Sequence, residues 1–202
     1  MKATKILMML FIAAILFATN VSPQEMTKEI IIGCETSLLT APVWVAENKG
    51  YFQEEGLNVK IKEFDSGKAS FAAMLNNKDI DICTVAQTPI MFHSFNRNDF
   101  VIIATMVYSD NDVKVLVRQD KRIINPLDLT GKKVGITKGS TGQFFLYLFL
   151  TYNGVISSKV ETIDLKPSEL AQALVDGRVD AICTWEPHLL KEAIRRESTY
   201  FA

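Results

Sequence analysis

The sequence is poor in the residues that build metal centres and disulfide frameworks, since it holds three cysteines and two histidines among 202 residues. Cys34, Cys83 and Cys183 stand far apart, and each lies in or at the end of an apolar run. This spacing argues against a zinc motif or a disulfide framework and favours small buried packing residues. His93 and His188 have no cysteine or carboxylate partner at metal-ligand spacing. We therefore expect no metal and no cofactor.

The sequence also lacks a strong charge of either sign, with 22 basic and 23 acidic residues. No basic run alternates with aromatic residues, so we expect no nucleic-acid partner. A Gly-x-Ser-x-Gly turn and a paired-acid constellation are absent as well. The sequence therefore predicts a protein that is not an enzyme.

The first 22 residues read as an export leader. Lys2 and Lys5 precede thirteen apolar residues, 6–18, a length typical of a secretory signal peptide and short for a membrane span. No clean Ala-x-Ala cleavage site follows, so an uncleaved N-terminal anchor remains an alternative. Without the two leader lysines, 20 basic residues face 23 acidic ones. The leader predicts a periplasmic location, either as a soluble protein or fixed to the membrane.

Beyond the leader, short apolar runs alternate with segments of helical character, which predicts an α/β fold with mostly parallel, doubly wound sheets. The predicted strands are 30–34, 57–64, 80–85, 101–107, 113–118, 133–137, 160–164 and 179–184. The predicted helices are 42–49, 68–77, 88–96, 126–129, 142–153, 168–176 and 187–197.

The clearest of these units lies near the start of the mature chain. Pro42 suits the first turn of a helix and Gly50 suits the position after its end. The strands on either side complete a βαβ unit, and such units place ligand sites at the carboxyl ends of their strands. That end is the hydroxyl-rich loop 35–40. Ser37 in this loop is a candidate ligand contact.

A short internal sequence repeat predicts two lobes. Ile82-Cys83-Thr84 leads to Pro89, and Ile182-Cys183-Thr184 leads to Pro187. The repeat is too short to prove a duplication, so convergence of two segments on a common helix–turn–strand unit would explain it equally. The predicted division is a leader at 1–22, a first lobe at 23–109, a second lobe at 110–186 and a return segment toward the first lobe at 187–202, which leaves that lobe incomplete.

The sharpest candidate site is the loop Gly139-Ser140-Thr141, which follows a predicted strand and precedes a predicted helix. Free N–H groups and the positive dipole end of a helix accept an oxyanion, and hydroxyls add donors. An ordinary helix cap without a ligand is the alternative.

Other candidate ligand contacts occupy comparable turns, where plain capping, a turn or core packing is the alternative. They are Ser66 and Gly67 after the second strand, Ala86, Gln87 and Thr88 after the third, Ser109 at the predicted crossing between lobes, and Trp185 and Glu186 after the last strand. Trp44, on the first helix, is expected to pack in the core.

Three stretches resemble one family. Residues 41–59 resemble its "AP" helix start and "GyF…GL.V" tail, residues 126–134 its lead-in to a "KGS" anion-binding loop, and Thr184-Trp185-Glu186-Pro187 its "WEP" element. The chain thereby resembles the periplasmic substrate-binding proteins of nitrate-, sulfonate- and taurine-type ABC importers (SsuA/THI5-like). Family members are usually about one hundred residues longer.

The resemblance implies a type II periplasmic-binding-protein fold that captures a small anionic or zwitterionic solute between two lobes and delivers it to a membrane permease. A monomer is expected. One alternative is an enzyme related to the pyrimidine-forming proteins of the thiamine pathway, whose cysteine-rich motif is not found here. Another is a membrane-anchored sensory module.

Overall fold

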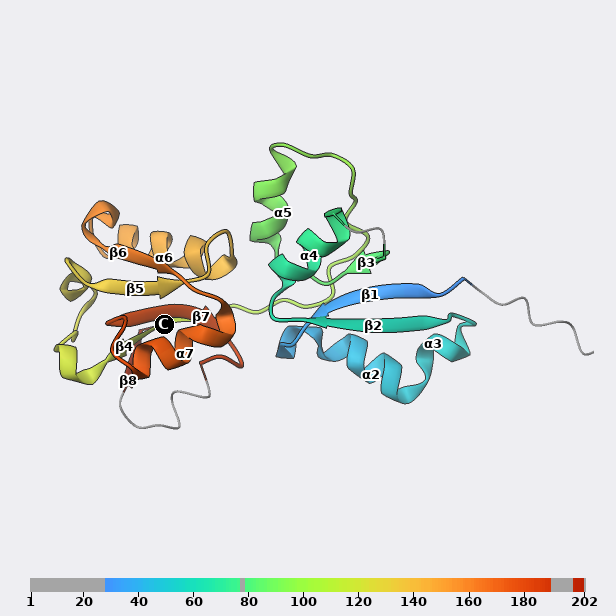
Figure 1. The fold of residues 1–202 in the computed structure, drawn as a ribbon, viewed down its shortest axis with the longest axis horizontal. Helices are drawn as coiled ribbons and strands as arrows, with labels where there is room; N and C mark the ends of the chain where they lie inside the picture. Colours follow the sequence, from blue (N-terminus) through green and yellow to red (C-terminus); the bar gives the residue numbers. More distant parts are fainter. Residues whose placement is uncertain (1–27, 77–78, 190–197, 202) are drawn as a thin grey trace, which may run out of the picture.

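Two separate β-sheets organise the chain (Figure 1). The structure, a computed structural model, describes residues 28–76, 79–189 and 198–201, and the side chains of 28–76 and 79–189. We call the first sheet and the helices around it the first lobe, and the second sheet and its helices the second lobe. In the described part of the chain, no helix is long and apolar enough to cross a membrane. The predicted leader, 1–22, lies outside the described residues.

The first lobe is a three-stranded parallel sheet in the order β2-β1-β3. Its strands are β1 (Ile30–Glu35), β2 (Val59–Phe64) and β3 (Ile82–Cys83). Helices lie on both faces of the sheet, as Figure 1 shows. They are η1 (Leu38–Thr40), α2 (Ala41–Lys49), α3 (Tyr51–Glu54), α4 (Gly67–Asn76) and α5 (Gln87–Ser94). The predicted βαβ unit is confirmed, with Pro42 in the first turn of α2 and Gly50 at its C-cap. The predicted turn after Gly50 instead contains the single helical turn α3.

The second lobe is a five-stranded mixed sheet in the order β6-β5-β7-β4-β8. Its strands are β4 (Val113–Arg118), β5 (Lys133–Ile136), β6 (Glu161–Asp164), β7 (Ala181–Trp185) and β8 (Ser198–Phe201). Its helices are η2 (Gln119–Lys121), η3 (Pro126–Leu129), α6 (Thr141–Tyr152), η4 (Ser157–Lys159) and α7 (Pro167–Val175). The strands β5, β6 and β7 are parallel, whereas β4 is antiparallel to both of its neighbours, β7 and β8.

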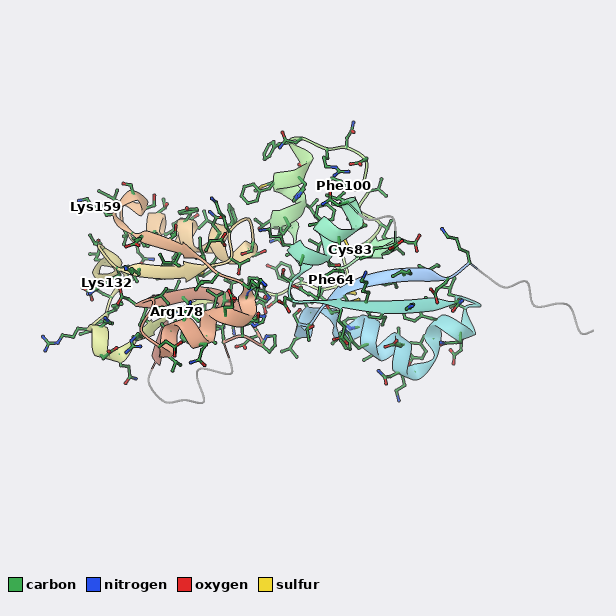
Figure 2. The ribbon with its side chains drawn as sticks, in the orientation of Figure 1. Phe64, Cys83, Phe100, Lys132, Lys159 and Arg178 are labelled. Atoms are coloured by element: carbon green, nitrogen blue, oxygen red, sulfur yellow. The ribbon has the colours of Figure 1, made fainter. Side chains whose placement is uncertain are left out.

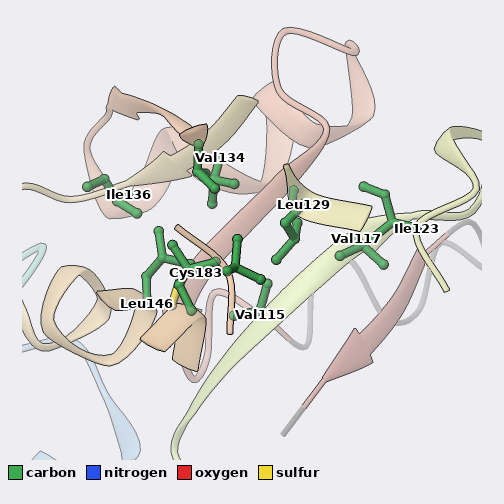
Figure 3. Close-up of a cluster of buried hydrophobic side chains, with 12 residues drawn as sticks. Val115, Val117, Ile123, Leu129, Val134, Ile136, Leu146 and Cys183 are labelled. Carbon is green, nitrogen blue, oxygen red and sulfur yellow. The ribbon is translucent and has the colours of Figure 1, made fainter. Parts of the chain in front are cut away.

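The two lobes have cores of very different size. In the second lobe, α6 covers one face of the sheet with a cluster of twelve buried residues, several of which Figure 3 labels, and α7 covers the other face with seven. The corresponding cluster of the first lobe has three buried residues, Ile32, Cys34 and Val43. The first lobe therefore has the smaller core, which agrees with the incomplete first lobe that the sequence predicted.

The three cysteines are free, and Cys34 and Cys183 are buried. Cys183 on β7 donates its S–H to the carbonyl oxygen of Gly142, in the first turn of α6, over 3.1 Å. Burial raises the pKa of the Cys34 and Cys83 thiols to about 11. These thiols stay protonated at neutral pH, which agrees with their predicted role in packing.

Two predicted elements differ from the structure. The segment 101–107 forms no strand. Phe100, just before it and labelled in Figure 2, packs its ring edge-on against Phe71 of α4. A strand needs a hydrogen-bonding neighbour, and none of the described residues supplies one here. The return segment 187–202 lies partly outside the described residues, at 190–197 and 202. Its residues 198–201 form β8, which pairs with β4 in the second lobe and not with the first sheet, because the outer edge of β4 offers a free ladder.

The unequal cores predict two steps of unfolding. We expect the first lobe to unfold at lower denaturant concentration, since it buries far less apolar surface. Leu146→Ala, on the buried face of α6 that packs against the second sheet, should lower the unfolding free energy of the second lobe by about 2–5 kcal/mol and leave the first step in place. Denaturant titration with hydrogen exchange read separately on β1 and β5 measures both steps. A single transition with equal protection of both sheets would contradict the expectation.

Candidate functional site

The carboxyl ends of the two sheets face each other between the lobes (Figure 1). Lys68, in the first turn of α4, donates from Nζ to the carbonyl oxygen of Lys138, which lies between β5 and α6. Nearby, Ser168 Oγ at the start of α7 donates to Asp65 Oδ2 after β2 over 3.5 Å. The loops that follow β2 in the first lobe therefore meet the loops that follow β5 and β6 in the second. The sequence predicts a shared ligand cleft at this junction, and that cleft stays a prediction.

A buried carboxylate holds the first-lobe side of this region together. Glu35, the last residue of β1, is 8% exposed, and its Oε2 accepts a hydrogen bond of 2.8 Å from the backbone N–H of Gly67. A Cβ atom at Gly67 would stand 2.9 Å from the Cα of Val85, which follows β3. The turns after β1, β2 and β3 therefore converge on one point, and only glycine fits there.

The acidic groups of this region have raised pKa values. Burial raises the pKa of Glu35, and the Gly67 hydrogen bond offsets part of that effect. Burial also raises the pKa of Asp112, just before β4, and the negative charge of Glu186 adds to the rise. Asp112 in turn raises the pKa of Glu35 slightly, so the three carboxyl groups lie within electrostatic reach of one another. We call Glu35, Asp112 and Glu186 the acidic floor of this region.

The predicted anion loop stands at the start of α6. Gly139 has a φ of 72°, the left-handed region that favours glycine, and its N–H donates to Gln143 Oε1 over 2.6 Å. Ser140 is buried and its Oγ donates to the carbonyl oxygen of Thr137 over 2.6 Å. The Ser140 proton is thus used inside the loop, which sequence reasoning did not foresee. Thr141 is half-buried, and its hydroxyl has no hydrogen-bond partner in the described part of the chain.

The donors left at this helix start are the Thr141 hydroxyl and the first backbone N–H groups of α6. In an α-helix these N–H groups have no preceding carbonyl to bind within the helix. The first intrahelical bond of this kind here runs from the Phe144 N–H to the Ser140 carbonyl oxygen. The amides of Thr141, Gly142 and Gln143 therefore have no acceptor within the helix, and they lie at the positive end of a twelve-residue helix.

The candidate residues of the first lobe take different positions. Ser66 is buried and its Oγ accepts from the Ala69 N–H over 3.2 Å, so it caps α4. Ala86 is the N-cap of α5, Gln87 is exposed at the first position of that helix, and Thr88 is buried behind it. Since α5 contacts α6 of the second lobe, Gln87 is the candidate of this loop with a free polar end at the junction.

Ser37 borders a largely apolar pocket of about 440 Å³ between η1, α2 and the end of β7. The pocket is lined by Thr36, Ser37, Leu38, Ala41, Trp44, Val45, Asn48, Lys49 and Pro187. Trp44, expected in the core, forms part of this wall, and its indole N–H is buried without a hydrogen-bond partner in the described residues. The pocket joins first-lobe residues to Pro187, which follows β7 of the second lobe.

The remaining candidates are less accessible or more distant. Trp185 is 6% exposed, and its ring packs edge-on against the ring of His188 at 5.8 Å, so core packing accounts for most of its surface. Glu186 is half-buried beside Asp112. Ser109 is exposed in the linker between the lobes, 100–112, and its Oγ accepts a hydrogen bond from the Asn111 N–H. Among the described residues it has no hydrogen bond to another candidate.

The structure places two further residues between the lobes, Glu35 and Lys68. The sequence predicted a ligand loop at 35–40 without singling out the Glu35 carboxylate, and it missed Lys68. Glu35 is an acid at the end of an otherwise apolar strand, and this position at a carboxyl end was the available signal. Lys68 follows the predicted Ser66–Gly67 turn directly, but its contact with Lys138 joins residues 70 positions apart. Such a pairing depends on how the lobes meet.

Known proteins with similar sequences are solute-binding proteins by name. The family described as NMT1/THI5 like matches residues 39–201. A putative aliphatic sulfonates-binding protein of Bacillus subtilis (strain 168) is 33% identical over 172 residues, covering 83% of this chain and 51% of the relative. A taurine-binding periplasmic protein of Escherichia coli (strain K12) is 26% identical over 164 residues, covering 81% and 50%. The chain thus spans about half the length of these curated relatives.

Solved structures show the same fold. The alkanesulfonate-binding protein of Xanthomonas axonopodis pv. citri, solved with MOPS bound, superimposes with a TM-score of 0.77 at 21% identity. The match covers 86% of this chain and 60% of that structure. At this identity the likeness establishes the architecture, a type II periplasmic-binding fold with an incomplete first lobe.

The raised pKa of Glu35 predicts a pH-dependent stability. The Glu35 carboxyl group binds its proton more tightly in the folded chain than in the unfolded chain, where a glutamate has a pKa of about 4.3. The contribution of Glu35 to stability therefore falls as the pH rises from the pKa of the unfolded chain through the higher pKa of the folded chain. Glu35→Gln keeps an oxygen for the Gly67 amide and removes the charge. Its unfolding free energy should equal that of the parent at low pH and exceed it at neutral pH.

Urea unfolding of parent and variant across this pH range measures the difference, which includes the electrostatic interaction between Glu35 and Asp112. Glu54→Gln, the same change in an exposed turn of α3, is the matched control. A parent more stable than Glu35→Gln at neutral pH would show that the charged form is the one the fold favours.

Proposed function

The chain belongs to the NMT1/THI5-like family, and on this premise we propose that it acts as an extracytoplasmic solute-binding protein of an ABC importer. Its ligand is a small oxyanion-type solute, such as a sulfonate, nitrate or taurine. The observation that carries the proposal is the convergence of loops from the carboxyl ends of both sheets, with the free start of α6 among them. The names of the relatives, sulfonate- and taurine-binding proteins, support the ligand class.

The anionic end of the solute binds at the start of α6 in this proposal. The amides of the first turn and the Thr141 hydroxyl donate to it, and the helix dipole favours its negative charge. The side-chain amide of Gln87, on the neighbouring helix of the other lobe, adds a further donor.

The acidic floor determines how the solute is oriented. Glu35 and Asp112 repel an anion, so the anionic group stays on the α6 side and a neutral or ammonium end of the solute lies toward the carboxyl groups. This arrangement suits a zwitterion as well as a singly charged anion.

Capture occurs by closure of the two lobes, a motion typical of such folds. The linker 100–112 joins the lobes, and the contact between Lys68 and the Lys138 carbonyl is one that opening would break. The closed protein then presents its solute to a membrane permease. An apolar leader directs export to the periplasm.

The alternatives drawn from the sequence, an enzyme of the pyrimidine-forming kind and an anchored sensory module, have no specific contact in their favour among the described residues. Ligand binding without turnover distinguishes the proposed function from the first. Mass analysis of the exported product distinguishes it from the second, since an anchored sensor retains its leader.

A thermal-shift screen tests the proposed ligand class. Taurine, methanesulfonate, nitrate and sulfate are compared with uncharged glycerol as the control. A solute present at one hundred times its dissociation constant should stabilise the folded chain by about 2.7 kcal/mol. Stabilisation by none of the oxyanions would overturn the proposal for this chain.

The start of α6 is tested with Thr141→Val. Loss of one hydrogen bond to a charged ligand costs about 1.5–3 kcal/mol, so affinity for the solute found by the screen should fall at least about tenfold. Calorimetric titration measures it. Thr151→Val, the same change at the other end of α6, removes a hydrogen bond to the Tyr147 carbonyl and should leave affinity unchanged. Equal losses in both variants would place the anion elsewhere.

A further inference from the structure

The second sheet brings three stretches of the chain together at the edge that faces away from the first lobe (Figure 1). The parallel strands β5, β6 and β7 begin at this edge, and β4, which is antiparallel to β7, ends there. The Gly131 N–H donates to the Lys159 carbonyl oxygen over 2.7 Å, and the Lys133 N–H donates to Asp180 Oδ2 over 2.9 Å. We call residues 118–133, 152–161 and 175–180 the outer edge.

The outer edge carries more positive than negative charge, although the whole chain is slightly acidic. It contains seven basic residues and five acidic ones, in a chain with 22 and 23. Three of the acidic residues are engaged within the fold, since Asp120 pairs with Arg118, Asp180 pairs with Lys121, and Asp128 accepts from two backbone N–H groups. The exposed basic residues without an ion pair in the described part of the chain are Arg122, Lys133, Lys159 and Arg178, of which Figure 2 labels the last two.

Exposed apolar side chains stand among these cations. The four most exposed large apolar side chains of residues 113–189 all lie on the outer edge, and we call them the apolar tips: Tyr152 at 85%, Ile124 at 80%, Leu127 at 59% and Ile156 at 57%. The other exposed ones in this range reach 40% at most. Ile124 and Ile156 each follow a residue that is buried in the core, Ile123 and Val155. Core packing therefore holds the turns that present the tips.

The turn before Ile124 has a strained backbone. Arg122 has a φ of 51°, in the left-handed region that favours glycine, and it is the one non-glycine residue with such a φ among those that the structure describes. Backbone strain of this kind gathers at functional sites. Here the turn exposes the side chains of Arg122 and Ile124 and buries Ile123 between them.

We propose that the outer edge binds the surface of a membrane that contains anionic lipids. The lipid phosphates accept hydrogen bonds from the exposed cations, and the apolar tips enter the boundary between the headgroups and the acyl chains. This combination favours a bilayer over a soluble anion, because a soluble anion would engage the cations and leave the apolar tips in water. The predicted leader, with thirteen apolar residues at 6–18, also brings the exported chain to a membrane.

Membrane contact at the outer edge leaves the region between the lobes free, since the outer edge lies at the opposite end of the second sheet. A chain held in this way stays close to a membrane permease, and this consequence rests on the proposed function. The binding of lipid is measured without any solute, so it holds or fails separately from the proposed solute binding.

Hydrogen exchange of the full chain tests the proposal in three conditions. They are vesicles of equal parts phosphatidylglycerol and phosphatidylcholine, vesicles of phosphatidylcholine alone, and inorganic phosphate without vesicles. The turns at 122–131 and 154–159 should exchange several-fold more slowly with the anionic vesicles only, and high salt should remove this protection. The amides of β1 and β2 should keep their rates. Absence of protection, or equal protection by phosphatidylcholine alone, overturns the proposal, and protection by inorganic phosphate does so by making a soluble anion the occupant.

Charge variants separate the outer edge from general electrostatic attraction. Lys159→Gln with Arg178→Gln removes two exposed cations, so the affinity for the anionic vesicles should fall at least about tenfold. Lys49→Gln with Lys60→Gln, at exposed sites of the first lobe, is the matched control and should retain the affinity. Vesicle sedimentation over a range of lipid concentrations measures both, and the leader contributes equally to every variant. Equal losses in the two pairs would overturn the proposal.

A second pair of variants tests the apolar tips. Ile124→Ser shortens a tip that is 80% exposed, so the chain folds and its affinity for the anionic vesicles should fall several-fold. Ile102→Ser makes the same change at a 66% exposed site between the lobes and should retain the affinity. Full affinity of Ile124→Ser would show that the cations act alone, and it would contradict insertion into the bilayer.

Discussion

The hydrogen bond between the Glu35 carboxylate and the Gly67 amide is the contact on which the region between the lobes depends. It joins the end of β1 to the start of α4 in a place that water hardly reaches. Val85 approaches so closely that Gly67 tolerates no side chain. With these turns held together, α4 begins at a defined point, and Lys68 one residue later reaches Lys138 of the second lobe.

This arrangement combines two opposite electrostatic preferences within a short distance. The start of α6 favours negative charge through its free amides and dipole, whereas Glu35 and Asp112 are buried carboxyl groups with raised pKa values. A solute that bridges the lobes is therefore selected by the position of its charge as well as by its size. The free amides belong to the second lobe, whereas the acidic floor combines Glu35 of the first lobe with Asp112 and Glu186 at the edge of the second.

The sequence predicted the regular parts of the fold to within a few residues. The βαβ unit around α2 followed from Pro42 and Gly50, and η3 and the strand–loop–helix unit around Gly139 were recognised in the same way. These elements depend on neighbours in the chain, so local patterns suffice to identify them. The strand expected at 101–107 was wrong because a strand is completed by a partner strand, and no pattern within the segment states whether the partner exists. Residues 198–201 likewise pair with β4 because the outer edge of that strand has no other partner among the described residues.

The sequence by itself determined the α/β class, the incomplete first lobe, the family resemblance and the loops that carry polar groups, because hydrophobic period, turn residues and motifs are local properties. Only the tertiary structure decided which of those polar groups remain available. The Ser140 proton is taken by the Thr137 carbonyl, the Ser66 oxygen by the Ala69 amide, and Trp185 packs against His188, while Thr141 and Gln87 keep free polar ends. A hydrogen-bonding group serves a ligand only if the fold does not use it first, and that competition is settled by the three-dimensional neighbours of each side chain.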